Sequence, residues 1–265
     1  MNRLEQLHDA HLGLDGYLKI AIAEIKKNST SLGILFGIFY ILVPIVSFAP
    51  SFNKLMELRP LFESLEARTT TLTQAQAAEI ISSLAGPLSI AIVILSIAFT
   101  WLGLATPLLI ERSIRGQSAT ALEVLSASLP KIPAGLVVGF VVSLLIFLSA
   151  ILFVIPAIYV GVCLAFTTFA ISLRGQFIDA ISYSYSLVKG QWWKVFIRLL
   201  LLGLMIFGVS FLLSLALTPV ELVLAPVAPL GVIISNLSLT LVGYLWSIVF
   251  IVMFLHLDYV RNPVR

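Results

Sequence analysis

Long apolar runs alternate along the chain with short polar connections, and this alternation is the main structural signal in the sequence. A transmembrane helix needs about 20 apolar residues to cross about 30 Å of hydrocarbon. Six runs of about that length carry almost no charge. The pattern predicts an all-α, polytopic membrane protein whose six transmembrane helices cover residues 31–49, 84–110, 134–155, 157–173, 195–217 and 232–257.

The least distinct boundary separates the third run from the fourth. Only Ile155 and Pro156 lie between them, so a sharp hairpin turn is expected there. The alternative is one long kinked helix. A helix of about 40 residues would be roughly 60 Å long, which is too long for a single crossing.

A polar segment at 174–194 lies between the fourth and fifth runs. Phe177, Ile181, Tyr185 and Val188 fall on one stripe of a helix. The pair Trp192–Trp193 then marks the headgroup layer, where amphipathic rings prefer to lie. Lys189 and Lys194 flank this pair. We predict a surface helix that leads directly into the fifth span, and the alternative is an ordinary polar loop.

Three further polar segments complete the layout. Residues 1–30 predict a cytoplasmic amphipathic segment, either one helix or two short helices broken near Gly16, and residues 111–133 predict a second surface helix. Residues 51–83 predict an external loop. Within this loop, Thr73 followed by Gln76 forms a capping pattern, which favours a helix start that continues into the second span.

Composition supports the membrane assignment. The chain of 265 residues is 60% hydrophobic and 11% charged, with a mean hydropathy of +1.08, whereas soluble proteins average about 25% charged residues. One integral membrane domain over 1–265 is expected, without a cleavable signal peptide. The single cysteine, Cys163, lies in an apolar run, so we expect a core role and no intramolecular disulfide.

The basic residues predict the orientation. Thirteen of the 16 lysines and arginines fall on one side of the predicted topology, and only Lys54, Arg59 and Arg68 fall on the other. The positive-inside rule makes the basic side cytoplasmic, and an even number of spans puts both termini there. We therefore expect a multi-pass protein of the bacterial inner membrane. The charge distribution does not resemble a nucleic-acid-binding patch.

The sequence also contains a weak internal repeat of surface helix, basic junction and helical hairpin. The tripeptide Arg-Gly-Gln occurs at 115–117 and 174–176, and an alanine follows each arginine by six residues. One interpretation is that three hairpins are arranged around a pseudo-threefold axis. The other is that the similarity between the segments arises by chance. The matching positions are Ala121 and Ala180, the junctions Lys27, Lys131 and Lys189, and the external prolines Pro50, Pro156 and Pro219.

Each Arg-Gly-Gln element suits a helix end at the membrane surface. Glycine ends a helix readily because it tolerates positive φ. The preceding arginine places a cation where the helix dipole and anionic lipid both favour it. Contact with lipid headgroups and simple anchoring both account for the cations and aromatic residues of the interface, which are Arg115, Lys131, Arg174, Lys189, Trp192, Trp193 and Lys194.

Few polar residues lie within the apolar runs. Asn236 is the main intramembrane polar candidate, for binding a substrate group or for a hydrogen bond between helices. Glu111 with Arg112 and Arg115 suggests an ion cluster at the surface. His8 and His11 stand three residues apart without a third ligand nearby, so no metal site is expected.

Small residues also indicate where helices approach closely. Gly135 and Gly139 form a small-xxx-small pair in the third run, and Gly33 and Gly37 form another in the first. Such pairs allow close backbone approach between membrane helices. The alternative interpretation is that these glycines have no special packing role, since glycine is common in membrane helices.

The segment from about residue 150 to 204 carries a more specific pattern. Pro156 starts a span, Ala180 lies in a surface helix, and Lys189-Gly190 with Trp192-Trp193 leads into the next span. This pattern resembles the YciC-type bacterial membrane proteins and the membrane domain attached to some glycerophosphoryl diester phosphodiesterases. The resemblance implies an integral membrane domain without a known reaction. This chain departs from the family in having Tyr183 and Tyr185 on the surface helix.

These observations favour a non-enzymatic membrane protein that binds lipid, or organises another membrane protein, through its cytoplasmic surface helices. No nucleophile, general base or metal set is evident in the sequence, so no catalysis and no cofactor are expected. The alternative is a transporter of lipid or a small apolar solute along a path between the hairpins. The expected partners are membrane lipids and another membrane protein, not nucleic acid.

Overall fold

The computed structural model describes residues 3–9, 12–60, 63, 73–175, 177, 179–224 and 230–262. These residues form helices and no strand, and six helical segments are long and apolar enough to span a membrane. The all-α prediction is confirmed. The six segments are Ser29–Glu57, Gln76–Ile114, Ala121–Leu152, Val154–Arg174, Trp192–Pro219 and Ile233–Arg261.

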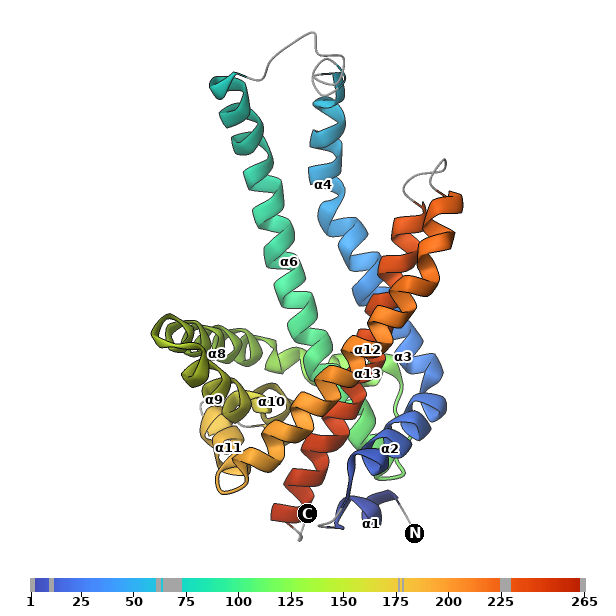
Figure 1. Cartoon of the computed structure of the whole chain (residues 1–265), viewed down its shortest axis with the longest axis vertical. Helices are drawn as coiled ribbons and strands as arrows, with labels where there is room; N and C mark the ends of the chain where they lie inside the picture. Colours follow the sequence, from blue (N-terminus) through green and yellow to red (C-terminus); the bar gives the residue numbers. More distant parts are fainter. Residues whose placement is uncertain are drawn as a thin grey trace. The chain divides into compact units, whose positions relative to one another are not determined.

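The chain divides into two compact units (Figure 1), one of residues 1–36 with 100–265 and the other of residues 37–99. The smaller unit holds a π-helical turn, η1 (Gly37–Leu42), then α4 (Val43–Glu57) and the first part of α6 (Gln74–Ile114). The first span was expected to end at Pro50. This prediction is wrong, because α4 continues through Pro50 to Glu57. The predicted start of α6 is confirmed, since Thr73 and Gln76 cap each other through both backbone N–H groups.

The larger unit begins with two short helices, α1 (Arg3–Leu7) and α2 (Leu14–Lys27). The break precedes Leu14, so Gly16 lies inside α2 and not at the interruption. After α3 (Ser29–Phe36) and the end of α6, a second surface helix, α7 (Ala121–Ser128), starts with a capping box between Thr120 and Glu123. Trp101 of α6 donates hydrogen bonds to Leu125 O and Ser128 Oγ, which fixes α7 against α6.

A short 3₁₀ turn, η2 (Leu129–Lys131), leads into the second hairpin, formed by α8 (Ile132–Leu152) and α9 (Val154–Leu164). The hairpin turns at Phe153, two residues before the expected Ile155–Pro156. The predicted fourth span is interrupted, because a turn at Ala165–Phe166 separates α9 from α10 (Thr167–Arg174). Ser184 bridges the interruption: its hydroxyl donates to Cys163 O and accepts from the Phe166 N–H.

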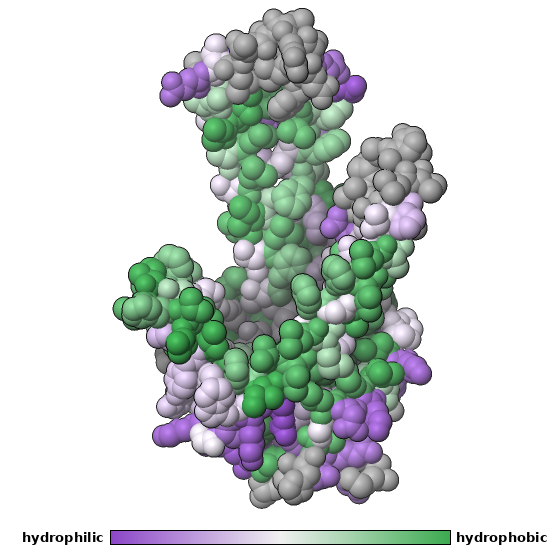
Figure 2. Space-filling model, viewed as in Figure 1, coloured by the Kyte–Doolittle hydropathy of each residue, from purple (hydrophilic) through white to green (hydrophobic). Residues whose placement is uncertain are grey.

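The remaining helices are the predicted surface helix α11 (Asp179–Val188) and a long hairpin of α12 (Trp192–Leu224) and α13 (Leu230–Arg261). Apolar side chains cover the hairpins of the larger unit, whereas charged side chains gather near the end where both termini lie (Figure 2). This separation is the one expected for a protein with one strongly basic membrane face.

Each of the three surface helices buries one face. In α2 and in α7 the buried residues recur at the same spacing, i, i+3, i+4 and i+7. In α11 they recur at a different spacing, i, i+4, i+7 and i+8. The buried sets are Tyr17, Ile20, Ala21 and Glu24 in α2, Ala121, Val124, Leu125 and Ser128 in α7, and Ala180, Ser184, Leu187 and Val188 in α11.

Two of the junction lysines make equivalent contacts. Lys27 Nζ donates to Ser113 O at 2.7 Å, and Lys131 Nζ donates to Ser172 O. Each acceptor carbonyl lies two residues before the arginine that ends its hairpin, Arg115 or Arg174. Both lysines therefore donate to carbonyl groups in the last turn of a helix, where a cation also interacts favourably with the helix dipole.

The glycine pair of α8 provides a test of the packing. A Cβ at Gly135 would lie 2.7 Å from Thr100 Cγ2 and 3.1 Å from Leu104 Cδ1, whereas nothing lies within 4 Å of one at Gly139. Gly135→Ala should lower the free energy of unfolding by about 1–3 kcal/mol, because Thr100 is stiff at χ1 and Leu104 is fully buried. The thermal midpoint of the purified protein in detergent measures the loss.

Gly139→Ala, one turn along the same helix, is the matched control and should be neutral or stabilising. If both substitutions lowered the midpoint equally, close approach at Gly135 would not be the cause.

Candidate functional site

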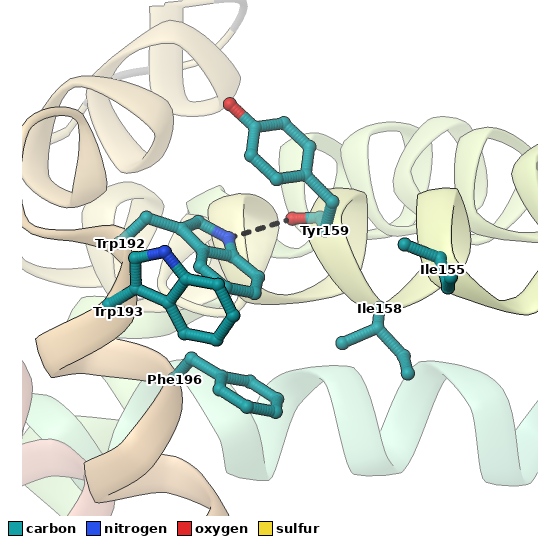
Figure 3. Close-up of a pocket in the computed structure, with 6 residues that line it drawn as sticks. All are labelled: Ile155, Ile158, Tyr159, Trp192, Trp193 and Phe196. Carbon is teal, nitrogen blue, oxygen red and sulfur yellow. Dashed lines mark hydrogen bonds between the residues drawn. The ribbon is translucent and has the colours of Figure 1, made fainter.

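Four of the predicted interface residues belong to two sites in the larger unit: Trp192 and Trp193 to one, Arg115 and Arg174 to the other. The first is a pocket of about 530 Å³ between α9 and the start of α12 (Figure 3), lined by Ile155, Ile158, Tyr159, Trp192, Trp193 and Phe196. Its volume lies within the range of about 300–1,000 Å³ that is usual for small-molecule sites. Its walls are aliphatic and aromatic, so an apolar ligand would suit it.

Ring packing shapes the wall that α12 contributes. Trp192 stacks on Phe196 with ring centroids 5.0 Å apart, and it meets Trp193 edge to face at 4.9 Å. Across the pocket, Trp192 stacks on Tyr159 at 5.5 Å and its indole Nε1–H donates to Tyr159 O at 3.4 Å (Figure 3). These contacts fix Trp192, whereas Trp193 is 68% exposed.

The surface helix α11 leads directly into this pocket. The predicted stripe does not form one exposed face: Phe177 precedes the helix, Val188 is buried and Ile181 is partly buried against the core cluster, so only Tyr185 is an exposed member within α11. The face that includes Ala180 packs on the protein.

Lysines stand on either side of the tryptophan pair. Lys189 is exposed and is followed by Gly190, whose φ of 87° ends α11, while Lys194 is exposed in the first turn of α12. Positive φ is a conformation that glycine adopts without strain. The pocket therefore has exposed cations beside an apolar interior, as a site for an amphiphilic anion would.

The second site is a cluster of ion pairs that we call the charged hub, formed where α6, α10 and α13 end. Arg174 lies at its centre, with a side chain that is only 6% exposed. Its Nη1 donates to Glu111 Oε1 at 2.8 Å, while Nε donates to Asp258 Oδ2 at 2.8 Å and Nη2 pairs with the same carboxylate. One guanidinium thus connects two carboxylates from different helices.

Four further groups surround this centre. Arg115 Nη2 donates to Glu111 Oε1 at 2.9 Å and its Nε donates to Tyr259 Oη at 3.1 Å, while Tyr183 Oη donates to Asp258 Oδ1. Burial lowers the pKa of Arg115, but the Tyr259 hydroxyl and the Glu111 charge outweigh that effect, so its pKa lies above the ordinary value. Asn262 also donates to Tyr183 Oη.

The structure corrects several expectations for these residues. Arg174 was a candidate for contact with lipid headgroups, but it is buried among protein carboxylates. Glu111 was placed in a surface cluster, yet it is 8% exposed. Arg115 and Lys131 are likewise hydrogen-bonded within the protein. The two arginines of the Arg-Gly-Gln repeat meet at a single carboxylate, Glu111, and Gly116 and Gly175 have the predicted positive φ.

Two other candidates also differ from expectation. Asn236 was predicted to be the most buried polar residue of the spans, but it is exposed, and the neighbouring Ser235 is the buried one. His8 stacks on Tyr259 with centroids 5.3 Å apart, whereas His11 lies outside the described residues. Within the part of the chain that the structure describes, there is no group of three His, Cys, Asp or Glu side chains placed to hold a metal ion.

Sequence reasoning missed Asp258 and Tyr183 as functional partners. The available signal was an acidic residue in the last turn of an otherwise apolar helix, which occurs at Glu111 and again at Asp258. Charge inside a membrane segment calls for a partner. The partner of Asp258 is Arg174, which lies 84 residues away in the sequence. The basic residue nearest to Asp258 in sequence is therefore not its partner.

Comparison with known proteins identifies no relative: no family model, no curated protein and no solved structure matches this chain. The site has to be interpreted from its own chemistry.

The charged hub should contribute strongly to stability. Arg174→Ala should lower the free energy of unfolding by about 3–5 kcal/mol, because it leaves Glu111 and Asp258 buried without their main cation. Thermal unfolding of the purified protein in detergent, followed by circular dichroism, measures the change.

Lys19→Ala is the matched control, since it removes the exposed Lys19–Asp15 pair of α2. Exposed pairs contribute little, so the thermal midpoint of this variant should stay at the wild-type value. Equal losses in the two variants would contradict a special role for the hub.

Proposed function

We propose that this chain is a non-enzymatic integral membrane protein that binds phospholipid in the pocket between α9 and α12. The observation that carries the proposal is a pocket with apolar walls, next to a surface helix and exposed lysines. An acyl chain suits the space between Ile155, Ile158 and Phe196. Lys189 and Lys194 are exposed near its tryptophan wall and suit an anionic headgroup.

The cellular setting is part of the same proposal. The excess of basic residues on one side supports a bacterial inner membrane location with both termini in the cytoplasm. The pattern from Ala180 to Trp193 supports membership of the YciC-type family. Organisation of another membrane protein through α11 is compatible with this function, because Phe177 before the helix and Tyr185 within it are exposed.

Lipid binding in this pocket predicts a specific loss on truncating its wall. Trp193→Ala should weaken binding of phosphatidylglycerol about tenfold, or about 1.4 kcal/mol, because the indole is a large part of the apolar wall. Native mass spectrometry of the purified protein, titrated with phosphatidylglycerol and phosphatidylcholine, measures the occupancy of each bound lipid.

Phe207→Ala is the matched control, since Phe207 is an equally exposed aromatic residue on α12 that does not line the pocket. It should bind both lipids as the wild type does. Lys189→Glu with Lys194→Glu should remove the preference for phosphatidylglycerol and keep the binding of phosphatidylcholine. Wild-type binding of both lipids by Trp193→Ala would refute the proposed site.

A further inference from the structure

The surface helix α11 determines where the second hairpin lies in the membrane. It has 10 residues, so it is about 15 Å long and cannot cross about 30 Å of hydrocarbon. Exposed Asp179 begins it and exposed Lys189 follows its end. Since charged residues at both ends require a polar environment, α11 stays at the basic face of the membrane and does not enter the hydrocarbon.

The supposed fourth span runs alongside this surface helix. Ala170 shares a packed cluster with Ala180, and Ser184 hydrogen-bonds at the Cys163–Phe166 break. Further along, Tyr159 stacks on Trp192. The residue number falls along α10 and the C-terminal part of α9 as it rises along α11, so these parts run antiparallel to α11. Because α11 does not enter the hydrocarbon, the part of this segment that packs along it also stays at the basic face and does not cross the membrane.

The contact between Tyr159 and Trp192 also limits how deep the hairpin reaches. Trp192 begins α12 between Lys189 and Lys194, at the basic interface. The turn at Phe153 is six residues before Tyr159, or about 9 Å along the helix. Since Trp192 Nε1 lies 3.4 Å from the backbone oxygen of Tyr159, the turn lies within about half the hydrocarbon thickness of the layer that holds Trp192.

The tip of the α8–α9 hairpin has the composition and the backbone hydrogen bonding expected of a segment inside hydrocarbon. Its five consecutive apolar residues are each at least 66% exposed, and an external turn would place them all in water. Phe153, the one non-helical residue between the helices, donates its N–H to Ser149 O and accepts from the Ala157 N–H. Lipid requires such internal pairing of the backbone. The tip residues are Ile151, Leu152, Phe153, Val154 and Ile155.

We propose that the α8–α9 hairpin is re-entrant: it enters the membrane from the basic side, turns at Phe153 within the hydrocarbon, and returns to the basic side. Its partner is the acyl-chain layer of the basic-side leaflet, which it enters as a wedge. Length and composition would let both helices cross, but their contacts with α11 and Trp192 hold them on one side. Four crossing helices then remain, and both termini stay on the same side.

Single-cysteine labelling in sealed membranes tests the proposal, in a Cys163→Ser background whose folding is checked by its thermal midpoint. Val154→Cys reports the tip. Asn53→Cys reports the outer side, and Ser126→Cys and Lys194→Cys report the basic side; all four positions are exposed. A membrane-impermeant maleimide should label the three controls from their own sides. Val154→Cys should stay unlabelled from both sides until detergent is added.

Labelling of Val154→Cys from the side that labels Asn53→Cys would overturn the proposal in favour of two crossing helices. Labelling from the side of Ser126→Cys would also overturn it, because the tip would then lie outside the hydrocarbon. The variant Tyr159→Cys with Trp192→Cys should be joined by a short bifunctional maleimide in native membranes, whereas Tyr159→Cys with Phe207→Cys should not. Failure of the first pair to cross-link would remove the contact on which the depth limit rests.

Discussion

The burial of Arg174 between Glu111 and Asp258 is the interaction on which the larger unit depends. Three helices, α6, α10 and α13, end at this point, and each brings the negative end of its dipole. Two buried carboxylates add further negative charge. The cluster is stable only because cations enter it from several elements, with Arg174 at the centre and the junction lysines on the neighbouring carbonyls. The basic excess of the sequence is therefore partly internal structure and not only attraction to lipid.

Two of the junction lysines share one kind of contact. Lys27 and Lys131 each donate to the carbonyl two residues before an arginine at a helix end. The second hairpin has a distinct far end, where the tip contains no polar residue and the returning helix is interrupted at Ala165–Phe166. Ser184 hydrogen-bonds the backbone at that interruption, so the returning helix can bend and follow α11.

The sequence predicts what depends on local pattern. Apolar runs gave the six long segments, and glycine after arginine gave the helix ends at Gly116 and Gly175. Burial of Glu111 and Asp258 could not be predicted in this way, because it depends on partners 63 and 84 residues away. The exposure of Asn236 has another cause: where every face of a helix is apolar, hydropathy does not indicate which face packs. The break at Ala165 likewise depends on Ser184, a side chain from another helix.

The two sites differ in how much of their polar chemistry is still available to a ligand. In the charged hub the carboxylates and guanidinium groups already pair with one another, so the geometry favours a structural role over binding or catalysis. Around the pocket, the indole of Trp192 bonds a carbonyl group within the protein, while Lys189 and Lys194 extend into the exposed surface. If the second hairpin lies in one leaflet, the pocket beside its tip opens only to the acyl chains of that leaflet. Binding would then distinguish between the two sides of the membrane, because only lipids on the basic side can place a phosphate near the lysines and a chain between the rings at the same time.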